Sequence, residues 1–319
     1  MSSRNQHVKK ADTTPRIAVL GSINMDLVIR CASLPSPGET ILAHSASEIC
    51  GGKGANQAVA AARAGAEVTM VGRVGNDAFA TRIIASFQRE RINSDYVLST
   101  TQSASGLAIV SVEQSGQNSI VVVPGANADL SVADVEAACS VIESSDVLLI
   151  QLEVPVETVI AAIRIAAAAD VRTILDPAPA PEHFPPELLH VDLVCPNESE
   201  AAAMIGARVD TIDGVETAAR ELHRRGARHV AITLGERGTL LWDGEKSHLI
   251  ETHSIKAVDT TAAGDAFAGA LAVYWADSNN LVDSVRFANA AGALAASREG
   301  AQPGMASRNE IESLWRRQL

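Results

Sequence analysis

Short apolar runs alternate with alanine-rich segments along most of the chain, and this alternation restricts the possible folds more than any other feature. Runs such as IAVL (17–20) and VLLI (147–150) are wholly apolar, which is typical of strands buried on both faces. The segments ANQAVAAARAGA (55–66) and VETVIAAIRIAAAA (156–169) have the length and composition of helices. Strands alternating with helices predict a parallel sheet, and right-handed crossovers place helices on both of its faces. We therefore expect a doubly wound α/β fold with a mostly parallel central sheet.

Composition agrees with one large domain. The chain has 319 residues, of which 47% are hydrophobic and 20% charged, so it can bury a sizeable core. Its net charge of −12 disfavours binding to nucleic acid or to anionic membranes. We expect a disordered tail over residues 1–14 and a single domain over 15–319.

The four cysteines form no C-x-x-C pair, so we expect reduced thiols rather than disulfides or a metal site. The polar opening MSSRNQHVKKADTT contains no apolar signal core, and no apolar run is long enough to span a membrane. These features predict a cytoplasmic protein.

Two segments interrupt the alternation. Residues 24–50 contain short alternating runs around a Pro/Gly turn, and residues 103–123 read as a hairpin that turns at 115–118. We expect these segments to form a small β-sheet that covers the cleft of the main domain as a lid.

The stretch VDTTAAGDAFAGALAV (258–273) predicts a helix from Ala266 onward, with Gly264 and Asp265 at its entry. The small residues Ala262, Ala263 and Gly264 leave backbone N–H groups uncovered, and such groups at a helix N-terminus bind anions. Asp265 could merely complement the helix dipole. We favour the alternative that it accepts the proton of a substrate hydroxyl that attacks phosphorus, with the dipole keeping the carboxylate ionised.

A glycine-rich turn precedes the first expected helix in CGGKGANQAVAAA (50–62). Its glycines permit close backbone approach to a ligand, and Lys53 and Asn56 supply donors beside them. The spacing excludes a P-loop. A tight turn without a ligand is the competing interpretation, and ligand binding is the better hypothesis.

Polar side chains follow two of the expected strands. Asn24 and Asp26 come after the first strand and should share one face, and Glu153 follows another strand. Open α/β sheets bind ligands at this edge. An Asx turn explains Asn24 and Asp26 equally well, and Glu153 alone could be solvated. With Lys53 as the only nearby cation, the set suits a neutral polyhydroxy ligand better than a phosphosugar.

Two further motifs have a structural and a functional interpretation. In PNESEA (196–201), Asn197 and Glu200 suit a helix N-cap, and they also suit a water-mediated Mg²⁺ site. In ITLGERG (232–238), a glycine-bounded turn could cradle nucleotide phosphates, although this local signal is weak.

The two glycine-containing motifs GGKGANQAVAAARAGA and DTTAAGDAFAGAL resemble, in this order, the two signatures of the ribokinase-like carbohydrate kinase family (PfkB type). The likeness runs from about Ile17 to the final helix, and GSINMD, PSPGET, QLE, DPAPA, PNESEA, ITLGERG and GAQP match as well. The resemblance implies ATP-dependent phosphorylation of D-ribose at its 5-hydroxyl, with Mg²⁺ and a monovalent cation, usually K⁺. It also implies a homodimer formed through the lid.

The resemblance assigns roles to matching positions. The sugar would be held by Asn24, Asp26, Gly52, Lys53, Asn56, Glu153 and Asp265. Asp265 would be the base, and the N–H groups of Ala262, Ala263, Gly264 and Asp265 the anion hole. ATP would lie along Asn197, Thr233, Leu234, Gly235, Glu236, Arg237, Gly238, Gly264 and Asn289, with Glu200 organising Mg²⁺. The K⁺ site would comprise Asp259, Thr261, Ala295, Arg298, Gly300 and Gly304, where Gly304 replaces a common serine and so loses a side-chain ligand.

Three alternatives remain. One is a kinase of the same family for deoxyribose, another sugar or a nucleoside. Another is a non-catalytic sugar-binding regulator, because fold does not determine function. A dinucleotide-dependent dehydrogenase is poorly supported, because no G-x-G-x-x-G follows the first strand.

Overall fold

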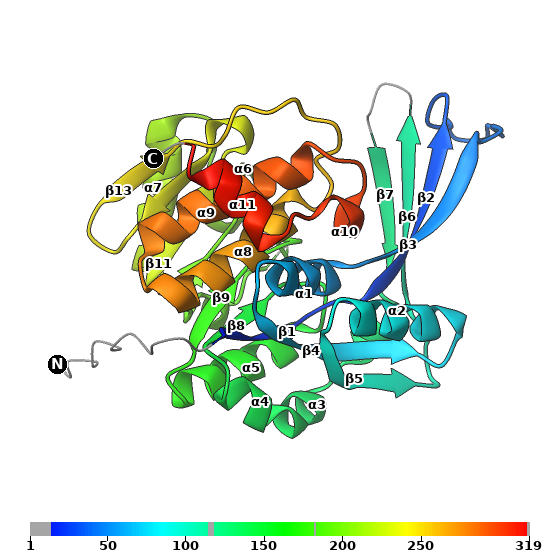
Figure 1. The fold of residues 1–319 in the computed structure, drawn as a ribbon, viewed down its shortest axis with the longest axis horizontal. Helices are drawn as coiled ribbons and strands as arrows, with labels where there is room; N and C mark the ends of the chain where they lie inside the picture. Colours follow the sequence, from blue (N-terminus) through cyan, green and yellow to red (C-terminus); the bar gives the residue numbers. More distant parts are fainter. Residues whose placement is uncertain (1–13, 114–117, 182, 318–319) are drawn as a thin grey trace.

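A nine-stranded sheet forms the centre of the protein in the computed structural model, which describes residues 14–113, 118–181 and 183–317 (Figure 1). The strand order is β13-β12-β11-β10-β9-β8-β1-β4-β5. From β5 to β11 all neighbours are parallel, whereas the β11–β12 and β12–β13 pairs are antiparallel, so β12 alone runs against the other strands of this sheet in the described residues. The strands are β1 (Arg16–Leu20), β4 (Glu67–Gly75), β5 (Asn93–Thr100), β8 (Val147–Ile150), β9 (Arg172–Leu175), β10 (Leu193–Val194), β11 (His229–Thr233), β12 (Thr239–Trp242) and β13 (Ser247–Ile250). The tail expected over residues 1–14 lies, except for Thr14, outside the described residues.

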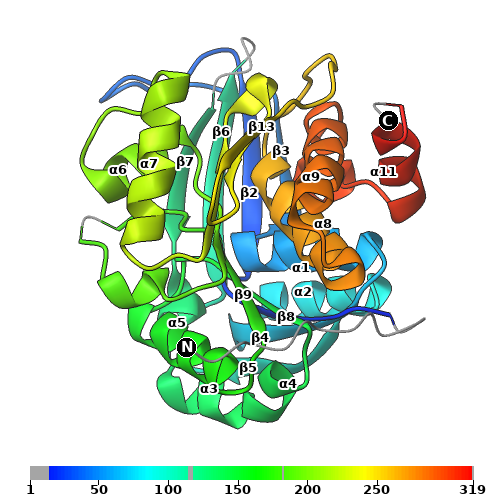
Figure 2. The ribbon, with the colours of Figure 1, turned by 90° about the vertical axis from the view of Figure 1, so that its left-hand side faces the viewer.

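Helices cover both faces of this sheet, as the strand–helix alternation predicted (Figure 2). In β1, Ile17 and Val19 enter one hydrophobic core and Ala18 and Leu20 enter the other, because successive side chains of a strand point to opposite faces. One face carries α1 (Lys53–Arg63), α2 (Ala78–Arg89), α8 (Ala263–Ser278), α9 (Leu281–Ala296) and α11 (Arg308–Trp315). The other carries α3 (Val132–Ala137), α4 (Cys139–Glu143), α5 (Val156–Ala168), α6 (Glu198–Ile205) and α7 (Ile212–Arg224). Among the described residues, no helix combines the length and the apolarity needed to cross a membrane.

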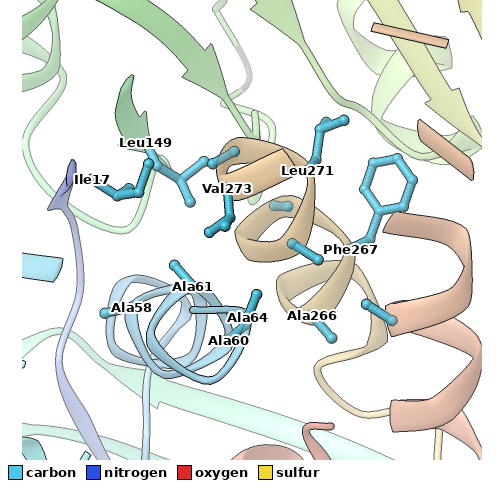
Figure 3. Close-up of a cluster of buried hydrophobic side chains, with 14 of the residues drawn as sticks. Ile17, Ala58, Ala60, Ala61, Ala64, Leu149, Ala266, Phe267, Leu271 and Val273 are labelled. Atoms are coloured by element: carbon cyan, nitrogen blue, oxygen red, sulfur yellow. The ribbon is translucent and has the colours of Figure 1, made fainter. Parts of the chain in front are cut away.

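Small residues bring α1 and α8 into close contact (Figure 3). A Cβ atom at Gly269 of α8 would lie 2.6 Å from Cβ of Ala60 and 2.7 Å from the carbonyl oxygen of Gln57. Only glycine fits at this crossing, and the alanines of α1 allow the same approach from the other side. The alanine enrichment therefore places the N-terminal ends of α1 and α8, which carry the predicted site residues, next to each other.

The two interrupting segments form a second sheet, which stands beside the main body (Figure 1). Its order is β3 (Ser45–Gly51), β2 (Asn24–Cys31), β6 (Gly106–Glu113) and β7 (Asn118–Val123). The β2–β6 pair is parallel and the two outer pairs are antiparallel. A small sheet from these segments was expected, and the turn predicted at 115–118 falls outside the described residues except for residue 118. Asn24 and Asp26 lie within β2 and not in a turn after β1, because β1 ends at Leu20 and the chain is extended again from Asn24.

Helix α8 begins at Ala263, three residues earlier than predicted. The N-cap residue Ala262 has φ 59°, in the left-handed region that non-glycine residues rarely adopt. This conformation turns the chain into the helix before the apolar run begins, so Asp265 lies inside the first turn. Such strain costs on the order of 1–3 kcal/mol and is common at functional sites.

Candidate active site

A cleft of about 420 Å³ opens at the carboxyl ends of β9, β10 and β11, beside the N-terminal end of α8. This is the edge of the sheet at which the strand-end rule placed the ligand. The cleft is lined by Lys53, Asp176, Cys195, Asn197, Glu198, Ser199, Glu200, Thr233, Gly235, Gly264, Phe267 and Ala268.

Asp265 is buried at this edge, and both of its carboxylate oxygens accept hydrogen bonds from α1. Nδ2 of Asn56 donates to Oδ2 at 3.0 Å, and Nε2 of Gln57 donates to Oδ1 at 3.1 Å. Burial raises the pKa of Asp265, although Lys53 and the two amides act in the opposite direction. The helix dipole was expected to keep this carboxylate ionised, and desolvation acts in the opposite direction. A raised pKa makes a carboxylate a stronger base near neutral pH.

Gln57 and Asp176 belong to the site but were not predicted. Nε2 of Gln57 also donates to Oδ2 of Asp176 at 2.7 Å, and Gln151 donates to the amide oxygen of Gln57. Nζ of Lys53 lies 4.0 Å from the same Asp176 oxygen. Burial raises the pKa of Asp176 to about 7, with Lys53 opposing. A signal was available for Asp176, because it follows β9 as Glu153 follows β8.

Lys53 is surrounded by acids. Burial lowers the pKa of Lys53, but Asp176, Asp265, Glu153 and Glu200 together outweigh burial and raise it. The side chain therefore stays protonated. It supplies a fixed positive charge between the two sides of the cleft.

Three of the four backbone amides predicted to form the anion hole are available for a ligand. The amides of Ala262, Gly264 and Asp265 donate to no group within the described part of the chain. A Cβ atom at Gly264 would meet nothing within 4 Å, so the space in front of this turn is open. Ala263 differs from the expectation, because its N–H donates to the carbonyl oxygen of Thr260 at 3.2 Å.

The predicted sugar-binding carboxylates lie at the boundary between the two sheets. Oδ1 of Asp26 is buried and has no hydrogen-bond partner among the described residues. Burial, followed by the charges of Glu153 and Asp265, raises the pKa of Asp26 to about 7. A Cβ atom at Gly51 would lie 2.1 Å from the Asp26 carboxylate, so β3 needs glycine here.

Glu153 is held by the glycine-rich turn. Its Oε2 accepts from the hydroxyl of Ser22 and, at 3.4 Å, from the backbone N–H of Lys53. The carboxylate is therefore positioned and not freely solvated. Buried acceptors without partners are costly, so Asp26 and its surroundings are suited to a ligand that brings hydroxyl donors.

The structural interpretation of PNESEA is confirmed, and the metal interpretation stays compatible with it. Asn197 and Glu200 form a capping box on α6, in which Oδ1 of Asn197 accepts from Glu200 N and Oε2 of Glu200 accepts from Asn197 N, both at 2.8 Å. Both residues also line the cleft. The second oxygen of Glu200 is a hard donor of the kind that suits Mg²⁺ through water.

The other residues predicted along the nucleotide are placed differently. Thr233 and Gly235 line the cleft, whereas Leu234 is part of the core and Arg237 pairs with Glu198. Glu236 is exposed, and Gly238 takes φ 91° beside the carbonyl oxygen of Ile250.

The side chain of Asn289 is hydrogen-bonded to residues in and next to the edge strands β12 and β13. It accepts from Thr239 Oγ1 at 2.7 Å and donates to the carbonyl oxygens of Ile250 and Glu251. The structure thus shows Asn289 supporting the edge strands. A contact with nucleotide stays a prediction.

The residues predicted to bind K⁺ come from the loop before α8 and from the segment that runs from the end of α9 to Gly304, and these two parts of the chain are in contact. Oδ1 of Asp259 accepts from Thr261 N at 2.9 Å, and Oδ2 accepts from Gly300 N at 3.0 Å. A Cβ atom at Gly304 would lie 3.4 Å from the carbonyl oxygen of Ala295 and 3.8 Å from that of Arg298. Within the described residues no cluster of three or more His, Cys, Asp or Glu side chains could hold a metal. The carbonyl oxygens of Ala295 and Arg298 are hard donors of the kind that suits an alkali cation.

Comparison with known proteins identifies related sequences over nearly the whole chain. The family model described as pfkB family carbohydrate kinase matches residues 14–308. The ribokinase of Bacillus subtilis is 40% identical over 298 residues, which cover 93% of this chain and 98% of that protein. A bifunctional ribokinase/ribose-5-phosphate isomerase A of Fructilactobacillus sanfranciscensis is 41% identical, and the match covers 93% of this chain but only 55% of that protein. A deoxyribokinase of Salmonella typhi is 35% identical over 93% of this chain and 99% of its own length.

Solved structures agree with the sequence matches. The structure of Arabidopsis thaliana ribokinase complexed with ribose and ATP superposes with a TM-score of 0.87. It is 33% identical, and the match covers 95% of this chain and 99% of that one. The architecture predicted from the strand–helix alternation is therefore also that of proteins with related sequences.

Proposed function

This chain belongs to the pfkB family of carbohydrate kinases, and we propose that it transfers the γ-phosphoryl group of ATP to the 5-hydroxyl of D-ribose. The observation that carries the proposal is the position of Asp265. It is a buried carboxylate held by two amides of α1, and it lies at a helix entry where three backbone N–H groups donate to no group among the described residues. An acid and an anion-binding turn in this arrangement suit phosphoryl transfer to a hydroxyl.

The residues would divide the work as follows. The carboxylate of Asp265 accepts the hydroxyl proton while the hydroxyl oxygen forms its bond to phosphorus, and the bond from phosphorus to the ADP oxygen breaks. The amides of Gly264 and Asp265 stabilise the negative charge on the transferred group. Lys53, protonated among the carboxylates, adds a positive charge on the side of α1.

Sugar recognition would use Asn24, Asp26, Gly52, Lys53, Asn56 and Glu153. Asp26 and Glu153 accept from hydroxyl groups and Asn24 donates. This mostly acidic set favours a neutral sugar, because a phosphorylated one would face Asp26 and Glu153 with a second negative charge. The β2-β3-β6-β7 sheet then covers the sugar and excludes water that could otherwise take the phosphoryl group.

Two cations complete the proposal. Mg²⁺ on the ATP phosphates, oriented by Glu200 through water, would neutralise phosphate charge. K⁺ beside Asp259 and the carbonyls of Ala295 and Arg298 would strengthen the field at the start of α8. Both donor sets fit, because they consist of oxygen atoms only.

We also infer a cytoplasmic homodimer formed through the lid. The support is the edge strand β7, on which Ile120, Val121, Val122 and Val123 are 42–59% exposed. An apolar edge strand of this kind favours pairing with another chain. Light scattering at several concentrations tests the dimer.

A coupled ADP-release assay across pentoses, hexoses, nucleosides and phosphosugars tests the activity. We expect the highest kcat/KM with D-ribose, and phosphorus NMR of the product should show a 5-phosphate. A higher kcat/KM with 2-deoxyribose would replace ribose by deoxyribose as the substrate. Ribose binding without any ATP consumption would favour the non-catalytic regulator.

A further inference from the structure

Asn127 is a buried polar residue that no motif identified. It lies in the 3₁₀ helix η1 (Gly125–Asp129), directly after lid strand β7, and is 1% exposed. Its side chain makes three hydrogen bonds to the start of β2. Oδ1 accepts from Ile23 N at 2.8 Å, and Nδ2 donates to Ile23 O at 3.2 Å and to Asn24 Oδ1 at 2.7 Å.

These contacts allow one orientation of the Asn127 amide. A backbone N–H can only donate and a backbone C=O can only accept, so Ile23 determines which end of the Asn127 side chain is oxygen and which is nitrogen. The nitrogen of Asn127 therefore faces Asn24. As a result, Asn24 turns its own oxygen toward Asn127.

The other end of Asn24 remains for a ligand. Nδ2 of Asn24 donates to no group among the described residues. It is also not one of the fully buried side-chain atoms that lack a hydrogen-bond partner. Two positions further along β2, on the same face, Oδ1 of Asp26 accepts from no donor that the structure describes. The strand thus offers one donor and one acceptor side by side.

The neighbouring strand leaves room for this contact. A Cβ atom at Gly106 of β6 would lie 2.2 Å from Asn24 Oδ1 and 2.3 Å from Asn127 Nδ2. Any larger residue at 106 would separate the two amides. Gly106 does not have positive φ, so its backbone would accept another residue and the space is the restriction.

We propose that Asn127 is a positioning residue that sets sugar specificity by holding Asn24 as a hydrogen-bond donor beside the acceptor Asp26. This inference rests on the proposed function. A sugar hydroxyl accepts from Asn24 and donates to Asp26, and therefore satisfies both groups at once. A sugar that lacks this hydroxyl leaves the buried Asp26 oxygen unpaired, which is the kind of defect that gives strong discrimination.

The variant Asn127→Asp tests the proposal with little change of shape. A carboxylate cannot donate to Asn24, so the Asn24 amide reverses and presents its oxygen to the sugar. We expect KM for ribose to rise about tenfold or more, as loss of one buried hydrogen bond does, while kcat and KM for ATP stay nearly unchanged. The preference for ribose over one monodeoxyribose should fall by a similar factor. Asn93→Asp, on an exposed part of β5, is the matched control.

A double-mutant cycle separates positioning from a merely structural role. In an Asn24→Ala background, Asn127→Asp should have almost no further effect on KM for ribose. Equal effects in both backgrounds would overturn the proposal, and so would an unchanged KM in the folded single variant. Should Asn127→Asp not fold, Gly106→Ala separates the same two amides, and its KM for ribose should rise in the same way. An unchanged KM in folded Gly106→Ala would count against the proposal.

The same cycle can be measured as ribose binding by calorimetry without ATP. If ribose binding depends on Asn127 through Asn24 but the protein consumes no ATP, the proposed kinase activity is refuted and the positioning role of Asn127 is supported. If the protein phosphorylates ribose but the effects of Asn127→Asp and Asn24→Ala are additive, the kinase activity is supported and the positioning role of Asn127 is refuted. A protein that neither binds nor phosphorylates ribose would overturn both.

Discussion

The amide nitrogen of Gln57 lies 3.1 Å from Oδ1 of Asp265, and the same nitrogen lies 2.7 Å from Oδ2 of Asp176. One side chain of α1 therefore joins the acid at the start of α8 to the acid at the end of β9. Gln57 is fully buried, and its oxygen accepts from Gln151, so the amide has a defined orientation. Phosphoryl transfer depends on the position of the base, and in the proposed mechanism this network holds Asp265 in that position.

Replacement of the proposed base is the most direct test of the proposed mechanism. Asp265→Asn removes the proton acceptor but keeps the shape, so we expect kcat to fall about 10²-fold or more. Ribose binding, measured by calorimetry, should change much less. Asp95→Asn, on an exposed position of β5, controls for the loss of one charge. A variant with near-normal kcat and intact folding would show that Asp265 is not the base.

Loss of the Gln57 network should affect both stability and turnover. Gln57→Met keeps the volume but leaves an oxygen of Asp265 and an oxygen of Asp176 without their donor. We expect the free energy of unfolding to fall by about 1–3 kcal/mol, measured by urea denaturation, because buried acceptors are left unpaired. We also expect kcat to fall about tenfold or more, because the base is less well oriented. Gln88→Met on the exposed side of α2 is the matched control, and equal effects in the two variants would contradict this role.

The stability of the sugar-free protein should depend on pH through Asp26. Its pKa is raised to about 7 from an ordinary value of 3.8, so the folded state binds this proton more tightly than the unfolded state. The associated stabilisation is fully present below about pH 4 and is lost as the pH rises through about 7. The variant Asp26→Asn has no titrating carboxyl group at this position, so its stability does not fall for this reason as the pH rises.

We therefore expect the melting temperature of Asp26→Asn, relative to the unaltered protein, to rise between pH 5 and pH 8. Thermal unfolding at several pH values without sugar measures this difference. Asp176 titrates in the same range but is present in both proteins, so it cancels in the comparison. A difference that does not change with pH would argue against a raised pKa at Asp26.

Removal of the monovalent cation should reduce activity. With K⁺ replaced by tetramethylammonium, which is too large for the loop around Asp259, we expect a several-fold lower kcat. The variant Gly304→Ser should strengthen K⁺ binding. The nearest atom to a Cβ at this position is 3.4 Å away, so serine fits and its hydroxyl adds a ligand. Half-maximal activation should then need less K⁺. Activity that is indifferent to the cation in both proteins would exclude the site.

Much of the fold could be predicted because its signals are local. The strands β1 and β8 are short, wholly apolar runs, and α1 and α5 are alanine-rich segments with the length of helices. The turn glycines and the motif around Asp265 mark the helix entries in the same way. Helix α8 begins three residues before the predicted start, because an alanine in the sequence gives no indication that Ala262 adopts a left-handed conformation.

The amino-acid sequence by itself determined the layered architecture, the small second sheet and the edge of the main sheet at which the candidate site lies. Hydrophobic periodicity and turn chemistry act over a few residues, so they can be read directly. Only the tertiary structure decided how Gln57 and Asn127 orient the groups around them. Their partners lie 208 and 103 residues away along the chain, and an amide shows no preference for either orientation until those partners are in place. Burial likewise decided the raised pKa values of Asp26 and Asp176, since desolvation depends on the folded surroundings and not on neighbours in sequence.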